Sequence, residues 1–373
     1  MPRFARMLVD GMAKRGHQLE VWSPRSRAFD IPAPNLLKKW LGYIDQYILF
    51  PKEVRKRLKS CSGNTLFVFT DQALGPWIPL VADRPHVIHC HDFLAQRSAL
   101  GEIAENHTKW TGRQYQAFIR RGYSHGRYFV SVSEKTRRDL HRLLSALPIF
   151  SEVVYNGLNS KFVPHDPVES RIQLSRKTGI DLSSGYILHV GGNDWYKNRA
   201  GVIAIYNAWR KHNVLVLPLL MVGHHPSKEL MKLYLQSPFK NDIYWLSNIN
   251  DEMVCFAYSG ACVFIFPSLA EGFGWPIAEA MASGCPVITT NEAPMTEVGG
   301  DAAFYIPRMP PDDSSAGTWA IDGAKVLNEV IVLPACELKD QIEAAFVNAR
   351  RFDPEITLDR IECIYKKILY LEG

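Results

Sequence analysis

The chain has 373 residues, 47% hydrophobic and 22% charged, a globular balance that excludes a mostly disordered protein. This length predicts two domains, and the net charge of +5 is too small to indicate nucleic-acid binding. No apolar run reaches the roughly 20 residues of a membrane-spanning helix, and no apolar core follows the basic N-terminus as a secretory signal would require. The seven cysteines include no Cys-x-x-Cys, which predicts reduced thiols in the cytosol.

Short apolar runs alternate with amphipathic stretches along the chain. The runs are rich in Val, Ile and Phe with little alternation, as in parallel strands covered on both faces. The predicted strands are Gln18–Trp22, Thr65–Phe69, His86–His89, Tyr128–Val132, Ser151–Tyr155, Tyr186–Val190, Leu215–Val222, Ile243–Trp245, Cys262–Phe266 and Pro286–Thr289. The predicted helices include Arg3–Arg15, Glu134–Leu144, Ala200–His212, Lys228–Gln236, Pro276–Ser283 and a last helix from about Pro354 to Leu371. This order predicts an α/β architecture with parallel sheets.

A domain boundary is expected near Asn156-Gly157, where a strand ends and a polar, proline-bearing stretch follows. The predicted units are an N-terminal domain of residues 1–155 and a C-terminal domain of residues 156–352. Residues 353–373 should form a helix that returns to the first domain. Asp353 could cap this helix, because proline at the next position suits a first helical turn.

The sequence opens directly with a helix. A doubly wound domain normally begins with a central strand and a glycine-rich turn. We therefore expect the first strand of the N-terminal domain to be missing, with roughly 10–20 further residues encoded upstream. The first sheet should then show a vacant central position, or a neighbouring segment displaced into it.

The stretch from Phe266 to Val287 is the most informative part of the chain. A buried strand ends at Phe266, a loop with two glycines follows, and Pro276 opens a helix. Glycines let backbone N–H groups approach a ligand, and a helix N-terminus favours anions, so this loop suits a phosphate. Glu271 and Glu279 flank it, and carboxylates accept paired hydroxyls, which indicates ribose and sugar contacts. The alternative is a plain strand–turn–helix with a capping glutamate.

At these residues the chain resembles the family 4 retaining glycosyltransferases. Their Glu-x7-Glu signature is matched by Glu271 and Glu279, and its surrounding string by Pro267 through Val287. The resemblance implies the GT-B fold, in which two Rossmann-like domains face a cleft, the first binding the acceptor and the second the nucleotide sugar. It also implies that Glu271 contacts the donor sugar and Glu279 the ribose. The other substrate-binding candidates of the loop are Gly272, Phe273, Gly274 and Trp275.

A second motif runs from His189 to Arg199, between a strand and a helix. Family members place there a lysine that binds the diphosphate, which Lys197 matches. A fixed cation would stabilise the charge that grows on the leaving group, although a solvated surface lysine is the alternative. Many relatives carry an arginine where this chain has Gly192, and Arg199 is the candidate replacement. Further substrate-binding candidates are Asn193 and, after the strand at Ile243–Trp245, Asn248 and Ile249.

His91 in the first half matches a family histidine that reaches the donor sugar across the cleft, and a capping or core histidine is the alternative. In a strand His89 would share its face, but no clear third metal ligand lies beside the pair. No Asp-x-Asp occurs, whereas metal-dependent glycosyltransferases of the other major fold use such a pair. We expect neither a metal nor a cofactor, with Lys197 and the helix N-terminus holding the diphosphate.

The segment 38–59 is basic and aromatic. Its seven Lys and Arg against two acidic residues give +5, and Trp40, Tyr43, Tyr47 and Phe50 recur at helix-like spacing. Such a helix can lie on an anionic membrane surface. The alternative is an ordinary surface helix whose aromatic stripe packs inward.

The sequence therefore predicts a retaining, metal-independent glycosyltransferase, placed by resemblance in bacterial polysaccharide assembly. The expected donor is UDP-glucose, with GDP-mannose as the competitor, and the expected acceptor is a glycan or lipid-linked glycan, with no nucleic acid. Catalytic candidates are Glu271, His91 and Lys197. A nucleotide-sugar epimerase of the same fold and a non-catalytic sugar-nucleotide-binding protein remain as alternatives. A Rossmann dehydrogenase is disfavoured because no strand precedes a Gly-x-Gly-x-x-Gly.

Overall fold

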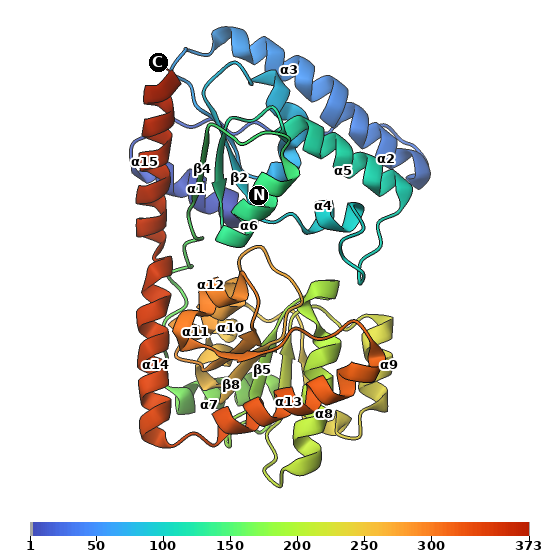
Figure 1. Ribbon diagram of the computed structural model, residues 1–373, viewed down its shortest axis with the longest axis vertical. Helices are drawn as coiled ribbons and strands as arrows, with labels where there is room; N and C mark the ends of the chain where they lie inside the picture. The colour runs from blue at the N-terminus through green and yellow to red at the C-terminus, as the bar shows by residue number, and fades with distance from the viewer. Residues whose placement is uncertain (1–2, 373) are drawn as a thin grey trace.

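Within residues 3–372, which the computed structural model describes, the chain forms two parallel sheets, one in each half (Figure 1). The first runs in the order β1-β2-β3-β4, with β1 (Phe67–Phe69), β2 (His86–Cys90), β3 (Tyr128–Ser131) and β4 (Phe150–Val153). The second runs in the order β10-β9-β8-β5-β6-β7, with β5 (Ile187–Val190), β6 (Leu219–Val222), β7 (Ile243–Leu246), β8 (Val263–Phe266), β9 (Val287–Thr290) and β10 (Phe304–Ile306). The predicted α/β class with parallel sheets is confirmed.

Helices surround both sheets. Those of the first half are α1 (Arg3–Lys14), α2 (Asn35–Ile44), α3 (Phe50–Arg57), α4 (Leu94–Ala99), α5 (Trp110–Tyr123) and α6 (Glu134–Leu143). The remaining helices are α7 (Pro167–Thr178), α8 (Arg199–His212), α9 (Lys228–Gln236), α10 (Asp251–Gly260), α11 (Trp275–Ala282), α12 (Met295–Gly299), α13 (Asp313–Ile331), α14 (Ala335–Ala349) and α15 (Pro354–Glu372). Apolar side chains cover both faces of the second sheet, which explains why its strands read as continuous apolar runs. In the described part of the chain, no helix is long and apolar enough to cross a bilayer.

The predicted strands are confirmed with one exception. Gln18–Trp22 is irregular, and Leu19 and Val21 within it are 47% and 60% exposed. This expectation was wrong because apolar alternation alone does not form a strand when no sheet neighbour covers the side chains. The strand predicted at 215–222 begins only at Leu219, and β10 was not predicted.

The first sheet has no central vacancy among the described residues. Its strands pair consecutively, and β1 forms one edge. Residues 18–22 pack against this edge through Trp22, whose ring lies 5.8 Å from that of Phe67, and do not pair with β1. The expectation of an open central position is therefore wrong.

The last helix completes the first domain. Figure 1 shows α14 and α15 along one side of both halves, with α15 beside α1. Asp353 accepts the backbone N–H groups of Glu355 and Ile356, at 2.8 and 3.2 Å, so the predicted cap is confirmed. Tyr365 of α15 reaches β2, where its hydroxyl lies 2.7 Å from Nε2 of His89. Apolar residues of α1 and α15 share one core cluster.

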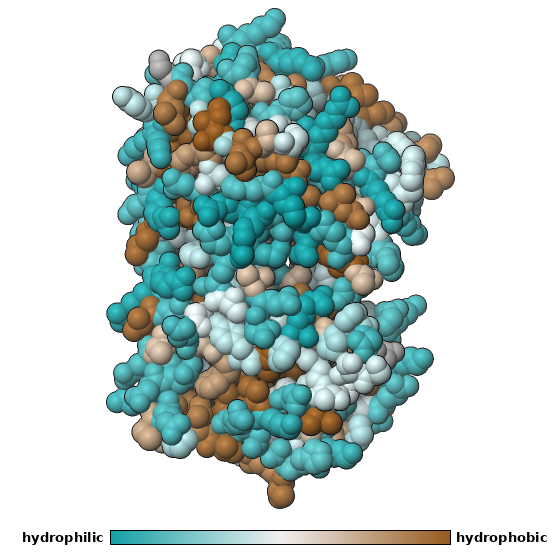
Figure 2. Space-filling view, viewed as in Figure 1, coloured by the Kyte–Doolittle hydropathy of each residue, from teal (hydrophilic) through white to brown (hydrophobic). Residues whose placement is uncertain are grey.

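The basic aromatic segment forms α2, a π-helical turn at Asp45–Leu49, and α3. Phe50 is buried, Tyr43 and Tyr47 are half-buried, and Trp40 is exposed. The aromatic stripe is therefore buried at its end on α3, whereas its end on α2 is exposed to solvent. Figure 2 shows hydrophobic residues at the edge of the molecule where Figure 1 places α2 and α5.

Candidate active site

The loop between β8 and α11 carries Glu271 at the carboxyl end of the second sheet, and α11 carries Glu279. The loop is anchored by Phe273, which is 3% exposed and packs with its ring centre 5.4 Å from that of Phe352. Gly274 follows with φ of +105°, a left-handed conformation that side chains disfavour. A glycine is therefore needed where the loop turns into the helix.

Glu271 and Lys197 form a nearly enclosed ion pair. Nζ of Lys197 lies 2.7 Å from Oε1 of Glu271, and the two side chains are 14% and 9% exposed. Ser268 donates its hydroxyl to the same carboxylate oxygen at 2.7 Å. Lys197 reaches this position from the turn before α8. The structure thus joins the two predicted motifs, which are 74 residues apart.

Glu279 is buried on α11, and its partner comes from the other domain. Its Oε1 lies 2.7 Å from Nη1 of Arg3 on α1, and its Oε2 accepts the hydroxyl of Tyr258 at 3.3 Å. The guanidinium of Arg3 also stacks on Trp275, 3.9 Å from the ring centre. Burial raises the pKa of Glu279, and the charge of Arg3 partly opposes this rise.

At Gly272 the two domains approach each other closely. A Cβ added there would lie 1.9 Å from the carbonyl oxygen of His91, at the end of β2. The carbonyl oxygen of Gly272 accepts hydrogen bonds from the hydroxyls of Ser133 and Thr136, at 2.7 and 3.2 Å. This glycine is required by close approach between domains.

A second contact between the domains lies at the start of α6. The carboxylate of Glu297, on α12, accepts the backbone N–H groups of Glu134 and Lys135 at 2.7 and 2.8 Å. A carboxylate at this end of a helix is favoured by unpaired N–H groups and by the helix dipole. Glu297 thus ties the first domain to the second beside the candidate site.

His91 and His89 serve different partners. Nε2 of His91 lies 2.9 Å from the carbonyl oxygen of Thr70, and the ring packs edge-on against Phe4. His89 is bound to Tyr365, and burial lowers the pKa of its imidazole to about 3. Burial raises the pKa of Asp92, which follows His91. Within residues 3–372, no group of three or more His, Cys, Asp or Glu side chains is placed to hold a metal ion.

Arg199 supports two loops at the carboxyl end of the second sheet. It is 4% exposed, and its Nη1 donates to Oδ1 of Asn193 at 2.6 Å and to the carbonyl of His224 at 3.0 Å. Its Nε and Nη2 have no partner in the described part of the chain, and burial lowers its pKa to about 10. Gly192 precedes Asn193 and is half-buried. The role of Arg199 toward the diphosphate stays a prediction.

Asn248 and Ile249 follow β7 at the same end of the sheet. They line a cavity of about 380 Å³, together with Trp245 and Met253. Asn248 has φ of +60°, which turns the chain sharply after the strand. These two candidates lie on a neighbouring loop rather than in contact with the two glutamates.

The family of the chain follows from its similarity to known proteins. Residues 1–162 match the family described as "Glycosyltransferase Family 4", and residues 170–315 match "Glycosyl transferases group 1". An MMP alpha-(1->4)-mannosyltransferase of Mycolicibacterium hassiacum is 33% identical over 355 residues, covering 80% of this chain and 79% of that protein. The chain belongs to glycosyltransferase family 4. The predicted resemblance is confirmed.

Other relatives match over a shorter length. O-antigen chain mannosyltransferase B of Escherichia coli is 27% identical over 54% of this chain and 52% of that protein. O-antigen chain mannosyltransferase RfbU of Salmonella typhimurium is 28% identical over 48% of this chain and 45% of that protein. The chain therefore spans about half the length of these two relatives.

Solved structures confirm the GT-B fold of this family member. WaaG, described as a glycosyltransferase involved in lipopolysaccharide biosynthesis, superposes with a TM-score of 0.66 at 17% identity, covering 96% of this chain and 94% of that chain. Anabaena HepE, solved with UDP and glucose, gives a TM-score of 0.64 at 17% identity, covering 86% of this chain and 81% of that chain. At this identity the likeness shows the fold alone.

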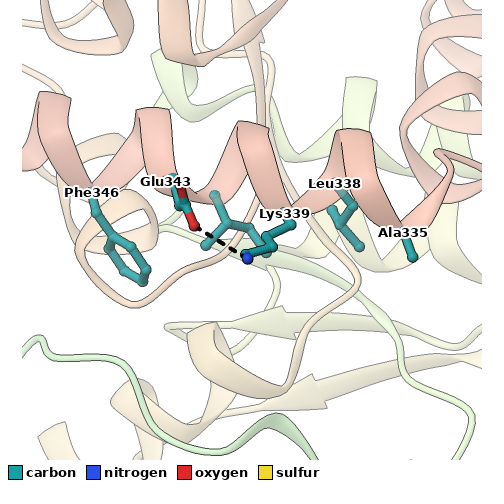
Figure 3. A pocket seen from close by; sticks show the side chains of 6 residues that line it. Ala335, Leu338, Lys339, Glu343 and Phe346 are labelled. Carbon is teal, nitrogen blue, oxygen red and sulfur yellow. Dashed lines mark ion pairs between the residues drawn. The ribbon is translucent and has the colours of Figure 1, made fainter.

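Sequence reasoning missed two residues of this glycosyltransferase site, Arg3 and Glu297. Arg3 lies 276 positions from Glu279, and no local pattern links the two. A larger hollow of about 410 Å³ lies along α14 (Figure 3). Its charged lining residues, Lys339 and Glu343, form an exposed ion pair at 3.8 Å. This hollow therefore lacks the buried carboxylate–cation pairs of the candidate site.

Proposed function

We propose that this enzyme transfers a hexosyl group from a nucleotide sugar to a glycan acceptor with retention of configuration. The observation that carries the proposal is the arrangement of Glu271 and Glu279. Each carboxylate lies 2.7 Å from a cation, and Arg3 reaches Glu279 from the opposite domain. A site that pairs carboxylates with cations at a domain boundary suits a ligand with both hydroxyls and phosphates.

In this proposal each predicted residue has a distinct role. Glu271 accepts hydroxyls of the donor sugar, Glu279 accepts the ribose hydroxyls, and Lys197 binds the diphosphate. Backbone N–H groups around Phe273 and Gly274 approach the sugar and phosphate. His91 meets the sugar from the first domain. The short contacts at Lys197 and Glu279 are those that such a ligand would exchange.

The proposed mechanism is front-side attack. The acceptor hydroxyl forms a bond to the anomeric carbon on the face that the diphosphate leaves, and a phosphate oxygen of the donor takes its proton. The bond between that carbon and the diphosphate breaks, and Lys197 stabilises the charge on the leaving group. Because this cation replaces a divalent ion, we expect transfer to survive EDTA. Loss of transfer with EDTA and recovery with magnesium would contradict this account.

For the donor sugar we propose mannose, carried by GDP. The sequence alone favoured UDP-glucose, but several relatives of the chain are named mannosyltransferases. Transfer from radiolabelled GDP-mannose and from radiolabelled UDP-glucose is measured for the wild type and for Glu271→Gln. The control variant is Glu343→Gln, on the outer face of α14. We expect transfer from GDP-mannose, lost only in Glu271→Gln. Transfer from neither donor would refute the function, and equal activity of both variants would refute the role of Glu271.

We further propose that the first domain contacts an anionic membrane that presents a lipid-linked acceptor. On α2, Leu36 and Trp40 are 84% and 63% exposed, and on α5 Trp110 is 72% exposed. The two helices are adjacent, because the rings of Tyr43 and Tyr115 stack 6.1 Å apart. Exposed aromatic residues among basic side chains are typical of helices that lie in a membrane interface.

The membrane proposal is tested with lipid vesicles. We expect sedimentation with vesicles that contain phosphatidylglycerol and little with pure phosphatidylcholine. Trp40→Ser and Trp110→Ser should each weaken binding, while Val214→Ser, at a 99% exposed site in the second domain, should not. Equal binding of all variants would refute this surface as the membrane contact.

A further inference from the structure

Lys197 is the cation that the proposed function assigns to the diphosphate, and it lies beside Glu271. Arg199 is buried, and its Nη1 donates to Asn193 and to the carbonyl of His224, which anchors that guanidinium to two loops. A diphosphate carries more than one negative charge, so a further cation beside Lys197 would stabilise it.

Arg3 is the cation that reaches this region from the other side of the cleft. Its side chain is 45% exposed, whereas that of Glu279 is 8% exposed, so Arg3 covers the buried carboxylate from the solvent side. Stacking on Trp275, the first residue of α11, holds the guanidinium at the amino end of that helix. The positive end of the α11 dipole lies here and also favours an anion.

The contact of Arg3 with Glu279 involves one nitrogen on one carboxylate oxygen. A guanidinium has five N–H donors in a rigid plane and binds phosphates through two at once. A ribose hydroxyl that takes the place of Nη1 on Oε1 would leave the charge of Arg3 beside the helix terminus. The diphosphate attached to that ribose would lie within the same region.

We propose that Arg3 is the second diphosphate-binding cation of this enzyme, supplied in trans by the first domain and held on Glu279 until the nucleotide arrives. This inference rests on the proposed function, since it assumes a nucleoside diphosphate at Glu279. It adds a residue of the first domain that contacts the ligand. Binding of the nucleotide exchanges partners and leaves neither charge unpaired.

The test compares a nucleoside diphosphate with its nucleoside. Binding of GDP and UDP to the full chain is measured by calorimetry, followed by guanosine or uridine, whichever matches the tighter ligand. We expect Arg3→Ala to weaken diphosphate binding about tenfold or more, because a hydrogen-bonded charge is lost. Nucleoside binding should stay equal or become tighter, because Oε1 of Glu279 is open. Arg3→Lys should recover part of the diphosphate affinity.

The matched control is Arg6→Ala, which removes the same charge from an exposed position one turn along α1. It should bind both ligands as the wild type does. Unchanged or tighter diphosphate binding in Arg3→Ala would overturn the inference, as would equal weakening of both ligands, which would mark a purely structural tie. If the wild type binds neither diphosphate, the proposed function fails and this inference fails with it.

Discussion

Replacement of Gly272 by alanine should separate the two domains at the site without unfolding either one. The added Cβ would lie 1.9 Å from the carbonyl oxygen of His91, whereas ordinary contact begins at 3.4 Å, so the loop must move by about 1.5 Å. That shift would also break the hydrogen bonds from Ser133 and Thr136, at about 1 kcal/mol each. Displacement of a catalytic group by about 1 Å costs about 100-fold in rate, so kcat/KM should fall by about this factor.

The assay is sugar transfer from the radiolabelled donor, with thermal unfolding measured in parallel. Gly63→Ala is the control, because an added Cβ there meets nothing within 4 Å. We expect Gly63→Ala to match the wild type in both measurements, and Gly272→Ala to lose activity with a Tm change of a few degrees at most. Activity of Gly272→Ala equal to that of the control would refute a functional role for this contact.

Three further predictions concern ionisable side chains that are buried or nearly enclosed. Lys197→Ala should lower kcat about 100-fold, while Lys211→Ala at the exposed end of α8 should not; equal rates would contradict the role of Lys197. Because burial raises the pKa of Glu279, nucleotide affinity measured by calorimetry should fall as the pH drops from about 7 to about 5; constant affinity would speak against this carboxylate. Burial lowers the pKa values of His89 and His189 to about 3, against 6.5 in the unfolded chain, so on acidification the unfolded state binds protons first and stability falls. Thermal unfolding should show a loss of about 2 kcal/mol per histidine from pH 6.5 to about pH 5, and a smaller loss in His189→Gln. Stability that does not change with pH would contradict this prediction.

Most of the fold could be predicted because its strands are short apolar runs between amphipathic helices. The start of α15 followed from Asp353 and Pro354, whose side chains act locally. The failures have physical causes. Residues 214–216 are apolar but exposed, so composition alone wrongly extended the strand that becomes β6. Strand β10 has only three residues, too short a run for composition to reveal.

The site could be predicted only where its residues lie in short sequence motifs. Lys197 and Glu271 lie in motifs whose spacing is visible in the sequence, and the structure joins them. Arg3 and Glu297 act across the domain boundary, on partners 276 and about 160 residues away. Such contacts depend on how two finished domains meet, and no local pattern encodes that arrangement.

The ion pairs of Glu271 with Lys197 and of Glu279 with Arg3 explain how acidic residues can lie in the site proposed for a negatively charged ligand. An isolated carboxylate in this buried position would be costly and would take up a proton, losing its capacity to accept two hydroxyls. Lys197 pairs with Glu271, and Arg3 pairs with Glu279 and opposes the rise that burial causes in its pKa. In the proposed function, the hydroxyls of the donor would replace the cations on the carboxylates, and its phosphates would bind the cations, so each charge would keep a partner in the bound state. Since Arg3 belongs to the first domain and Lys197 to the second, this exchange makes the fully compensated site depend on both domains being in contact.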